Sequence, residues 1–454
     1  MLKEDAEKKI NAFLLLTVTI AATGGLLFGF DTGNIAGALI FIKQSWHTST
    51  FTDEVIVSIT VLGAFVGAIL SGTLVERLGR RKMMLAAATL FILGASAGSF
   101  VYDVSTLLTA RLLLGLAIGI SSYTAPLYIS EVAPAQFRGL LVLLHGVAIT
   151  LGEAVAFVSD YVLSSGRHWR IMIFLGVIPA LILFIGMLKM PASPRWLIAV
   201  NKVQMAKTVL QQIRRRSNVD QEFSQIKNIV ESPKFSLKAL VLSEHWRKPL
   251  MIGIGLGMLQ QFFGINTVMY YGPFIFKSAG FQSHNAQILA TFSMGVVNML
   301  MTIFTGFYVD RWGRRKLLMG GSLLAGFSLL SIPFLLHRGP DSDYSTWLLL
   351  GAMIFYVIGY CLSVGSLFWL IISEIFPLRV RATAMSLATA IQWLANLLVS
   401  LTFLTMLDRL GTRLTFSIYA SLCFLGFFFS YCLVPETKGL SLETIESHWH
   451  KKCN

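Results

Sequence analysis

Charged residues are scarce in this sequence. Only 13% of its 454 residues are Asp, Glu, Lys or Arg, whereas soluble domains contain about 25%. Hydrophobic residues make up 55% of the chain, and its mean hydropathy is +0.69. Apolar runs of about 20 residues recur between short charged segments, which is the length that spans a bilayer as a helix. These features exclude an ordinary soluble domain and predict an all-α polytopic membrane protein.

Cysteine is also rare, and the four residues form no recognisable site. Three of them, Cys361, Cys423 and Cys432, fall in apolar runs, and Cys453 lies next to the end. Their spacing contains no C-x-x-C pair, so neither a metal site nor a disulfide framework is expected. The sequence also lacks a phosphate-binding loop or a nucleophile–base motif, so we expect neither an enzyme nor a bound cofactor.

Twelve apolar runs predict twelve transmembrane helices. They cover residues 12–42, 55–75, 83–102, 104–128, 140–163, 170–189, 249–276, 286–309, 316–336, 347–373, 382–407 and 412–434. The predicted organisation is an N-terminal six-helix bundle (1–189), a cytoplasmic linker (190–248), a C-terminal six-helix bundle (249–434) and a cytoplasmic tail (435–454). Apolar residues recur at helical spacing within 203–216, so short surface helices are expected in the linker.

Basic residues are distributed unequally between the two sides of the predicted membrane. If both termini are cytoplasmic, 29 Lys and Arg residues lie on the cytoplasmic side, seven lie on the outer side, and Arg111 lies inside a span. Because cytoplasmic loops carry an excess of Lys and Arg, this bias predicts that orientation. It also explains the net charge of +14 without a nucleic-acid partner. No N-x-S/T sequon occurs, which favours a bacterial inner membrane.

Three loop motifs occur twice, at an offset of 234 to 244 residues. ERLGRRKMML (76–85) returns as DRWGRRKLLM (310–319), EVAPAQFRG (131–139) as EIFPLRVRA (374–382), and PASPR (191–195) as PETKG (435–439). The near-constant offset indicates a duplicated six-helix unit with both copies in the same orientation. Transporters built from such parallel repeats bind substrate between the halves, near the middle of the membrane.

With QQFFGINTVMYYG (260–272) and SEIFP…QWLAN (373–396), these motifs resemble the sugar porter family of the major facilitator superfamily over nearly the whole chain. The pattern is most similar to bacterial proton-coupled monosaccharide symporters. The resemblance implies the major facilitator fold, two bundles that rock in alternating access, and a functional monomer. Its implied partners are a monosaccharide, protons and the lipid bilayer, with no metal or cofactor.

The resemblance also assigns a gating role to charged residues at the cytoplasmic ends of the spans. In the family, such carboxylates and arginines form ion pairs that hold the halves together on the inside in the outward-open state. The matching residues here are Glu76, Arg80, Arg81, Glu131, Arg138, Asp310, Arg314, Arg315, Glu374 and Arg381. Anchoring the topology is the simpler role of the basic members.

Polar and aromatic residues inside the spans are the candidates for substrate binding. An amide offers both donor and acceptor groups to sugar hydroxyls, although such residues also form ordinary interhelical hydrogen bonds. A helical step from Gln260 predicts Asn266 and Tyr270 on one broad face of span seven. The family resemblance extends the set to Phe28, Gln260, Gln261, Asn266, Tyr270, Asn298, Trp369, Gln392 and Trp393. Three positions depart from the family pattern: Gly146 replaces a substrate-contacting glutamine, Ser366 replaces a proline, and Glu153 stands where a bacterial relative has glutamine.

Three charged residues inside the spans are candidates for proton coupling. Asp31 and Arg111 lie at similar predicted depths, and an intramembrane arginine needs a partner. Proton-coupled sugar porters have an aspartate and an arginine at these positions, whereas passive members usually have asparagine in place of the aspartate. Glu153 lies at a similar depth and is a second candidate for carrying the proton. A static ion pair between Asp31 and Arg111 is the structural alternative.

The sequence analysis therefore favours proton-coupled import of a monosaccharide, such as a hexose or pentose. A facilitative uniporter of a sugar or polyol on the same fold is the nearest alternative, and Asp31 distinguishes the two. A sugar sensor that does not transport is a further alternative from another functional class. Only about 20 residues follow span twelve, whereas sensors of that kind usually carry long cytoplasmic tails.

Overall fold

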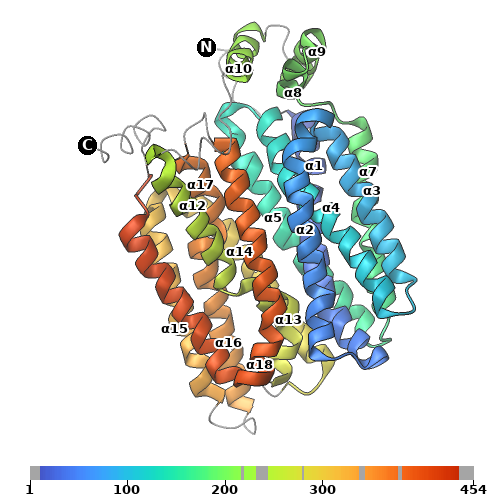
Figure 1. Ribbon diagram of the computed structural model, residues 1–454, viewed down its shortest axis with the longest axis vertical. Helices are drawn as coiled ribbons and strands as arrows, with labels where there is room; N and C mark the ends of the chain where they lie inside the picture. The colour runs from blue at the N-terminus through green and yellow to red at the C-terminus, as the bar shows by residue number, and fades with distance from the viewer. Residues whose placement is uncertain are drawn as a thin grey trace.

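Helices make up all the regular structure that the computed structural model describes, which comprises residues 11–215, 219–231, 244–278, 281–336, 343–376 and 381–438. The long helices run side by side, and the short linker helices α8, α9 and α10 lie beyond one end of them (Figure 1). The N-terminal half contains α1 (Ala12–Trp46), α2 (Thr50–Leu78), α3 (Arg80–Ser99), α4 (Val104–Val132), α5 (Arg138–Ser164), α6 (Trp169–Leu175) and α7 (Val177–Lys189). The linker contains α8 (Pro194–Ala199), α9 (Val203–Arg214) and α10 (Asp220–Glu231).

The C-terminal half repeats the pattern with more interruptions. It contains α12 (Glu244–Phe262), α13 (Ile265–Ser278), α14 (His284–Trp312), α15 (Arg314–Leu336), α16 (Asp343–Tyr360), a π-helical turn (Cys361–Gly365), α17 (Ser366–Ile375) and α18 (Arg381–Leu433). Eleven segments of the described chain are long and apolar enough to cross a membrane. The last of them includes Gly411, whose φ of 75° and ψ of 166° are not helical, so α18 contains two spans. The predicted twelve-span all-α architecture is confirmed.

Two glycines show the internal repeat in the backbone. Gly79 ends α2 and precedes α3, and Gly313 occupies the same place between α14 and α15. Their φ angles are 86° and 85°, values that a residue with a Cβ atom rarely adopts. The glycine in each R-x-G-R-R motif therefore lets the chain reverse between two spans within one residue.

Glycines also bring helices of the N-terminal half into close contact. Gly25, Gly29, Gly33 and Gly37 form a stripe at four-residue spacing on α1 that faces α5. A Cβ atom added at Gly29 would lie 1.8 Å from the carbonyl oxygen of Ile149. Small residues allow such close approach in membranes, where helices associate through packing and not through the hydrophobic effect. The stripe fixes the position of α5 against α1, and both helices carry site residues.

The structure corrects the prediction that span seven is one continuous helix. The chain breaks at Gly264, which has a φ of 88°. Gln260 and Gln261 therefore lie on α12, and Asn266 and Tyr270 lie on α13. A helical step cannot relate residues on the two sides of this break, so the argument for one shared face was wrong. Span ten is interrupted as well, by the π-helical turn, and Ser363 within that turn has non-helical angles.

Candidate functional site

A buried ion pair lies in the middle of the N-terminal half. Arg111 Nη1 donates to Asp31 Oδ1 at 2.6 Å, joining α4 to α1. Arg111 is 2% exposed and Asp31 is 7% exposed, and Arg111 Nε also donates to the carbonyl oxygen of Ile56 at 3.4 Å. A charge at this depth is costly in a membrane unless it is paired or faces a polar cavity. The structure therefore joins the two residues whose depths matched in the sequence.

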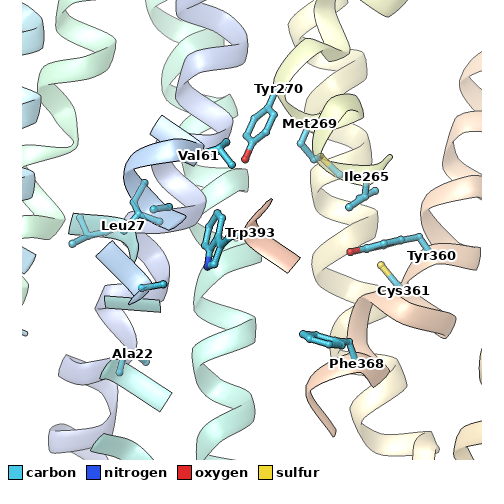
Figure 2. Close-up of a cluster of buried hydrophobic side chains, with 14 of the residues drawn as sticks. Ala22, Leu27, Val61, Ile265, Met269, Tyr270, Tyr360, Cys361, Phe368 and Trp393 are labelled. Carbon is cyan, nitrogen blue, oxygen red and sulfur yellow. The ribbon is translucent and has the colours of Figure 1, made fainter. Parts of the chain in front are cut away.

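Aromatic residues from both halves surround this ion pair. A small pocket of about 10 Å³ is lined by Asp31, Arg111, Phe28, Tyr270 and Trp393, which is room for about one water molecule. The rings of Phe28 (α1) and Trp393 (α18) are 5.4 Å apart at an angle of 51°. Tyr270 and Trp393 lie near each other in the space between the halves (Figure 2). A buried carboxyl group and three aromatic rings thus share one pocket.

Amide side chains of the C-terminal half form two separate hydrogen-bonded groups. Gln392 Nε2 donates to Gln260 Oε1 at 2.8 Å, and Gln260 Nε2 donates to the carbonyl oxygen of Gly365 at 3.2 Å. Across the break in span seven, Asn266 Nδ2 donates to Gln261 Oε1 at 2.7 Å. Gln392 Oε1 has no hydrogen-bond partner among the described residues. An amide can offer either a donor or an acceptor to a hydroxyl.

Glu153 links the two halves through a hydrogen bond to Asn298. It lies on α5 and is 5% exposed. Its Oε2 accepts from Asn298 Nδ2 of α14 at 3.0 Å, and Asn298 Oδ1 accepts from the Cys361 thiol at 3.1 Å. Asn298 was predicted as a sugar ligand and Glu153 as a proton carrier, but their direct contact was not predicted.

Three predicted positions lie apart from these contacts. Trp369 packs against Phe368 with ring centroids 4.9 Å apart and is 41% exposed, so it does not line the pocket at Asp31. A Cβ atom added at Gly146 would meet no heavy atom within 4 Å, which leaves open space where the family has glutamine. Ser366 has a buried hydroxyl with no hydrogen-bond partner among the described residues.

Equivalent polar clusters hold helices together at the linker end of each half. In the N-terminal half, Glu131 accepts from Arg80 at 2.8 Å and from Ser193 at 2.5 Å. In the C-terminal half, Glu374 accepts from Arg314 at 2.7 Å and from Thr437 at 2.5 Å. All six residues belong to the repeated sequence motifs. Each cluster lies within one half, so these ion pairs stabilise the halves individually in this structure.

The remaining residues predicted for the gate follow the same internal pattern. Glu76 and Asp310 pair with the arginine four residues later, at 3.2 and 2.8 Å. Arg81 donates to the carbonyl oxygens of Met187 and Leu188, and Arg315 donates to that of Tyr431. Arg138 Nε donates to the carbonyl oxygen of Ser130 at 3.0 Å. Arg381 begins α18, but its side chain lies outside the described part, as do residues 1–10 and 439–454 of the predicted termini.

Hydrogen bonds cross between the halves at the opposite end. The Glu54 carboxylate of α2 accepts from both the backbone nitrogen and the hydroxyl of Thr405, at 2.7 and 2.6 Å. Thr50 donates to Asp408 at 2.6 Å, and Ser164 donates to Asn285 at 2.7 Å. These contacts join the two halves at the end that the predicted topology places outside.

Sequence reasoning missed a further buried carboxyl group on α5. Asp160 is 0% exposed, and its Oδ1 accepts from Asn34 Nδ2 at 3.3 Å. A second acidic residue within the predicted span 140–163 was the signal that could have revealed it. Among the described residues, no cluster of three or more His, Cys, Asp or Glu side chains has the arrangement of a metal site.

Comparison with known proteins gives consistent matches along the chain. A family model described as "Sugar (and other) transporter" matches residues 17–449. The galactose-proton symporter of Escherichia coli (strain K12) is 38% identical over 442 residues, which cover 97% of this chain and 95% of that protein. The arabinose-proton symporter of the same strain is 36% identical over 445 residues, covering 97% and 93%. The partially occluded, inward-open structure of the xylose transporter XylE from E. coli has a TM-score of 0.83 at 29% identity, covering 95% of this chain and all of that one.

Proposed function

The chain belongs to the sugar transporter family, and from this membership we propose that it imports a monosaccharide together with a proton. It is a multi-pass plasma-membrane transporter and not an enzyme. The observation that carries the proposal is the shared pocket: the buried Asp31–Arg111 pair and the rings of Phe28, Tyr270 and Trp393 line the same space. Proton binding and sugar binding at one place can therefore influence each other directly.

The ion pair supplies a physical route for this coupling. Protonation of Asp31 removes the negative charge that holds Arg111, so the contact between α1 and α4 weakens. Phe28 lies one helical turn before Asp31 on α1, and its ring contacts Trp393 of the other half. A shift of α1 at Asp31 is therefore transmitted to an aromatic surface on which a sugar ring can stack. The proton is the ligand that changes the preferred arrangement of the halves.

The two ends of the molecule supply the gates of an alternating-access cycle. The hydrogen bonds of Glu54 and Thr50 close the outer end, while the charged clusters at the linker end remain within their halves. Opening to the outside requires the outer contacts to break and the linker ends to approach each other. The charged residues of the repeated motifs then come close enough to pair across the halves, which is their proposed gating role. In this cycle the transporter works as a monomer with both termini in the cytoplasm.

The neutral site residues hold the sugar in this proposal. Gln260, Gln261, Asn266, Asn298 and Gln392 exchange hydrogen bonds that they now make within the protein for bonds to sugar hydroxyls. Trp393 and Phe28 offer faces to the apolar C–H surface of the sugar ring. The relatives that transport galactose and arabinose together with protons support a hexose or a pentose as the substrate class.

Uptake by the Asp31→Asn variant tests the proposal. The protein is reconstituted into vesicles, and uptake of labelled hexoses and pentoses is measured with and without an inward proton gradient. We expect the gradient to concentrate sugar in the wild-type vesicles. Asn keeps the size of the side chain but cannot release a proton, so Asp31→Asn should lose accumulation and retain sugar exchange at equal pH.

Asp160→Asn is the matched control, because it removes another buried carboxyl group from the same half. It should retain accumulation. Wild-type uptake that equilibrates sugar but ignores the gradient would overturn symport and establish the uniporter instead. Binding of sugar without uptake or exchange would establish a sensor.

A further inference from the structure

Cys361 occupies the first position of the π-helical turn that interrupts span ten. It is 0% exposed, and its thiol donates to Asn298 Oδ1 at 3.1 Å. Its own carbonyl oxygen accepts from Thr305 Oγ1 at 3.3 Å. Both partners lie on α14. Irregular backbone at membrane depth needs such partners, so α14 holds the interrupted span through this residue.

The Asn298 amide has two different neighbours because its two ends differ chemically. Its oxygen accepts from Cys361, and its nitrogen donates to Glu153 Oε2 at 3.0 Å. Asn298 and Cys361 belong to the C-terminal half, and Glu153 belongs to the N-terminal half. The three residues thus form one polar link across the middle of the molecule. Figure 2 shows Cys361 beside Tyr360, with Leu27 of the N-terminal half on the opposite side of this space.

Helix packing sets the register of this link. α5 and α14 pack in an antiparallel manner, with Leu143 against Gly306 and Phe157 against Gly295. Glu153 lies between these two contacts on α5, and Asn298 lies between them on α14. The register leaves the amide facing the carboxyl group directly, at the interface where an alternating-access transporter must separate its halves.

We propose that Cys361 is a positioning residue of the sugar site: its thiol orients the Asn298 amide so that the amide nitrogen points at Glu153 and into the path of the substrate. This inference rests on the proposed sugar transport and deepens it. A sugar hydroxyl that enters between α5 and α14 takes the place of Glu153 or binds beside it. The fixed amide then presents a donor without first having to rotate.

The chemistry of the thiol makes this role specific. A thiol that donates its proton accepts poorly, so Cys361 binds the amide oxygen and not the amide nitrogen. Without that donor, only the bond to Glu153 holds the amide, and a sugar that displaces Glu153 leaves the amide able to rotate by half a turn about its last bond. It then presents its oxygen to the site in place of the donor. Sugar binding has to restore the productive orientation, which weakens apparent affinity and leaves the later steps unaffected.

Sugar exchange between the two sides of vesicle membranes at equal pH tests the proposal. Cys361→Ala should raise the KM for sugar about threefold to tenfold, because one hydrogen bond that orients a ligand is lost, with the maximal exchange rate kept within about twofold. Cys361→Ser should restore most of the affinity, because a hydroxyl is also a donor. Cys423→Ala is the matched control: Cys423 is equally buried in the same half, and its removal should leave the KM unchanged.

A double-mutant cycle separates positioning from general packing. In an Asn298→Ala background, Cys361→Ala should add less than a twofold change, because the group that it orients is already gone. Equal effects of Cys361→Ala and Cys423→Ala, an effect that Ser does not reverse, or full additivity with Asn298→Ala would each overturn the proposal. Exchange at equal pH needs no proton gradient. A failure of proton coupling in the uptake assay is therefore distinguishable from a failure of this inference.

Discussion

At the scale of single residues, the amide of Gln260 already has hydrogen-bond partners at both of its ends before any substrate hydroxyl reaches it. Gln260 both accepts from Gln392 and donates to Gly365. A sugar that binds here replaces these bonds, so each new contact contributes only the difference between the bond gained and the bond lost. Selectivity among sugars then depends on which hydroxyls reproduce this pattern best, and an amide left unpaired by a wrong sugar is penalised.

Gly146 offers a residue-scale test of how the site recognises its sugar. Gly146→Gln introduces the amide that the family resemblance predicts there, and no heavy atom lies within 4 Å of the new Cβ position. One added hydrogen bond should lower the KM for the preferred sugar about threefold to tenfold. The measurement is the concentration dependence of sugar uptake in vesicles.

Gly139→Gln is the matched control for this substitution. Gly139 lies on the same helix, nearer its first residue, and also has open space at its Cβ position. Its substitution should leave the KM unchanged. If Gly146→Gln abolishes uptake, or if both variants change the KM alike, the open space at Gly146 is not part of the sugar site.

At the scale of elements, the positions of the spans were predictable because lipid imposes a simple rule. Backbone groups in the bilayer must be satisfied within the segment, so each long apolar run becomes a helix. The breaks were not predictable by that rule. Gly264 is one of 38 glycines, most of which do not interrupt a helix, and CLSVG (361–365) contains no proline to mark its π-helical turn.

The same contrast applies to pairs of residues in the site. The Asp31–Arg111 pair was predictable from depth, because Arg111 is the one basic residue deep inside a predicted span and Asp31 lies near its level, although Glu153 lay at a similar depth. The contact between Glu153 and Asn298 was not predictable, since it depends on how α5 and α14 are rotated and on their register across the interface. A single sequence shows how deep a charged residue lies in its span, but it does not show how two helices are rotated and aligned against each other.

The glycine stripe of α1 gives an element-scale prediction about stability. In Gly29→Ala, the new methyl group would lie 1.8 Å from the carbonyl oxygen of Ile149. To relieve this overlap, the backbone of α5 would have to move away from α1, which destabilises the folded protein. Overpacking of this kind costs about 1–3 kcal/mol or more. We expect a lower midpoint of thermal unfolding in detergent and less protein in the membrane.

Gly351→Ala serves as the control for the stripe, because no heavy atom lies within 4 Å of its Cβ position. It should leave the unfolding midpoint unchanged or raise it slightly, since Ala favours a helix over Gly. Equal midpoints for Gly29→Ala and the wild type would contradict the close approach of α1 and α5.

At the scale of the whole molecule, the two ends are held together differently. At the linker end, repeated clusters around Glu131 and Glu374 bind helices within each half. At the other end, Glu54 and Thr50 bind one half to the other. This arrangement suits rigid halves that rock about their shared middle, because motion at the outer end breaks a few polar contacts and leaves the packing within each half intact.

We expect the contact of Glu54 with Thr405 to set the balance between states that are closed and open at the end opposite the linker. Glu54→Ala removes two hydrogen bonds across the halves, which should favour the open state by about tenfold or more. Spin labels at Phe51 and Leu410, with Cys432 and Cys453 replaced by serine, report the distance between the halves at this end. We expect longer distances to gain population.

Asp103→Ala is the control, because Asp103 caps its own helix through Thr106. This variant should leave the distance distribution unchanged. Identical distributions for Glu54→Ala and the wild type would show that other contacts close this end.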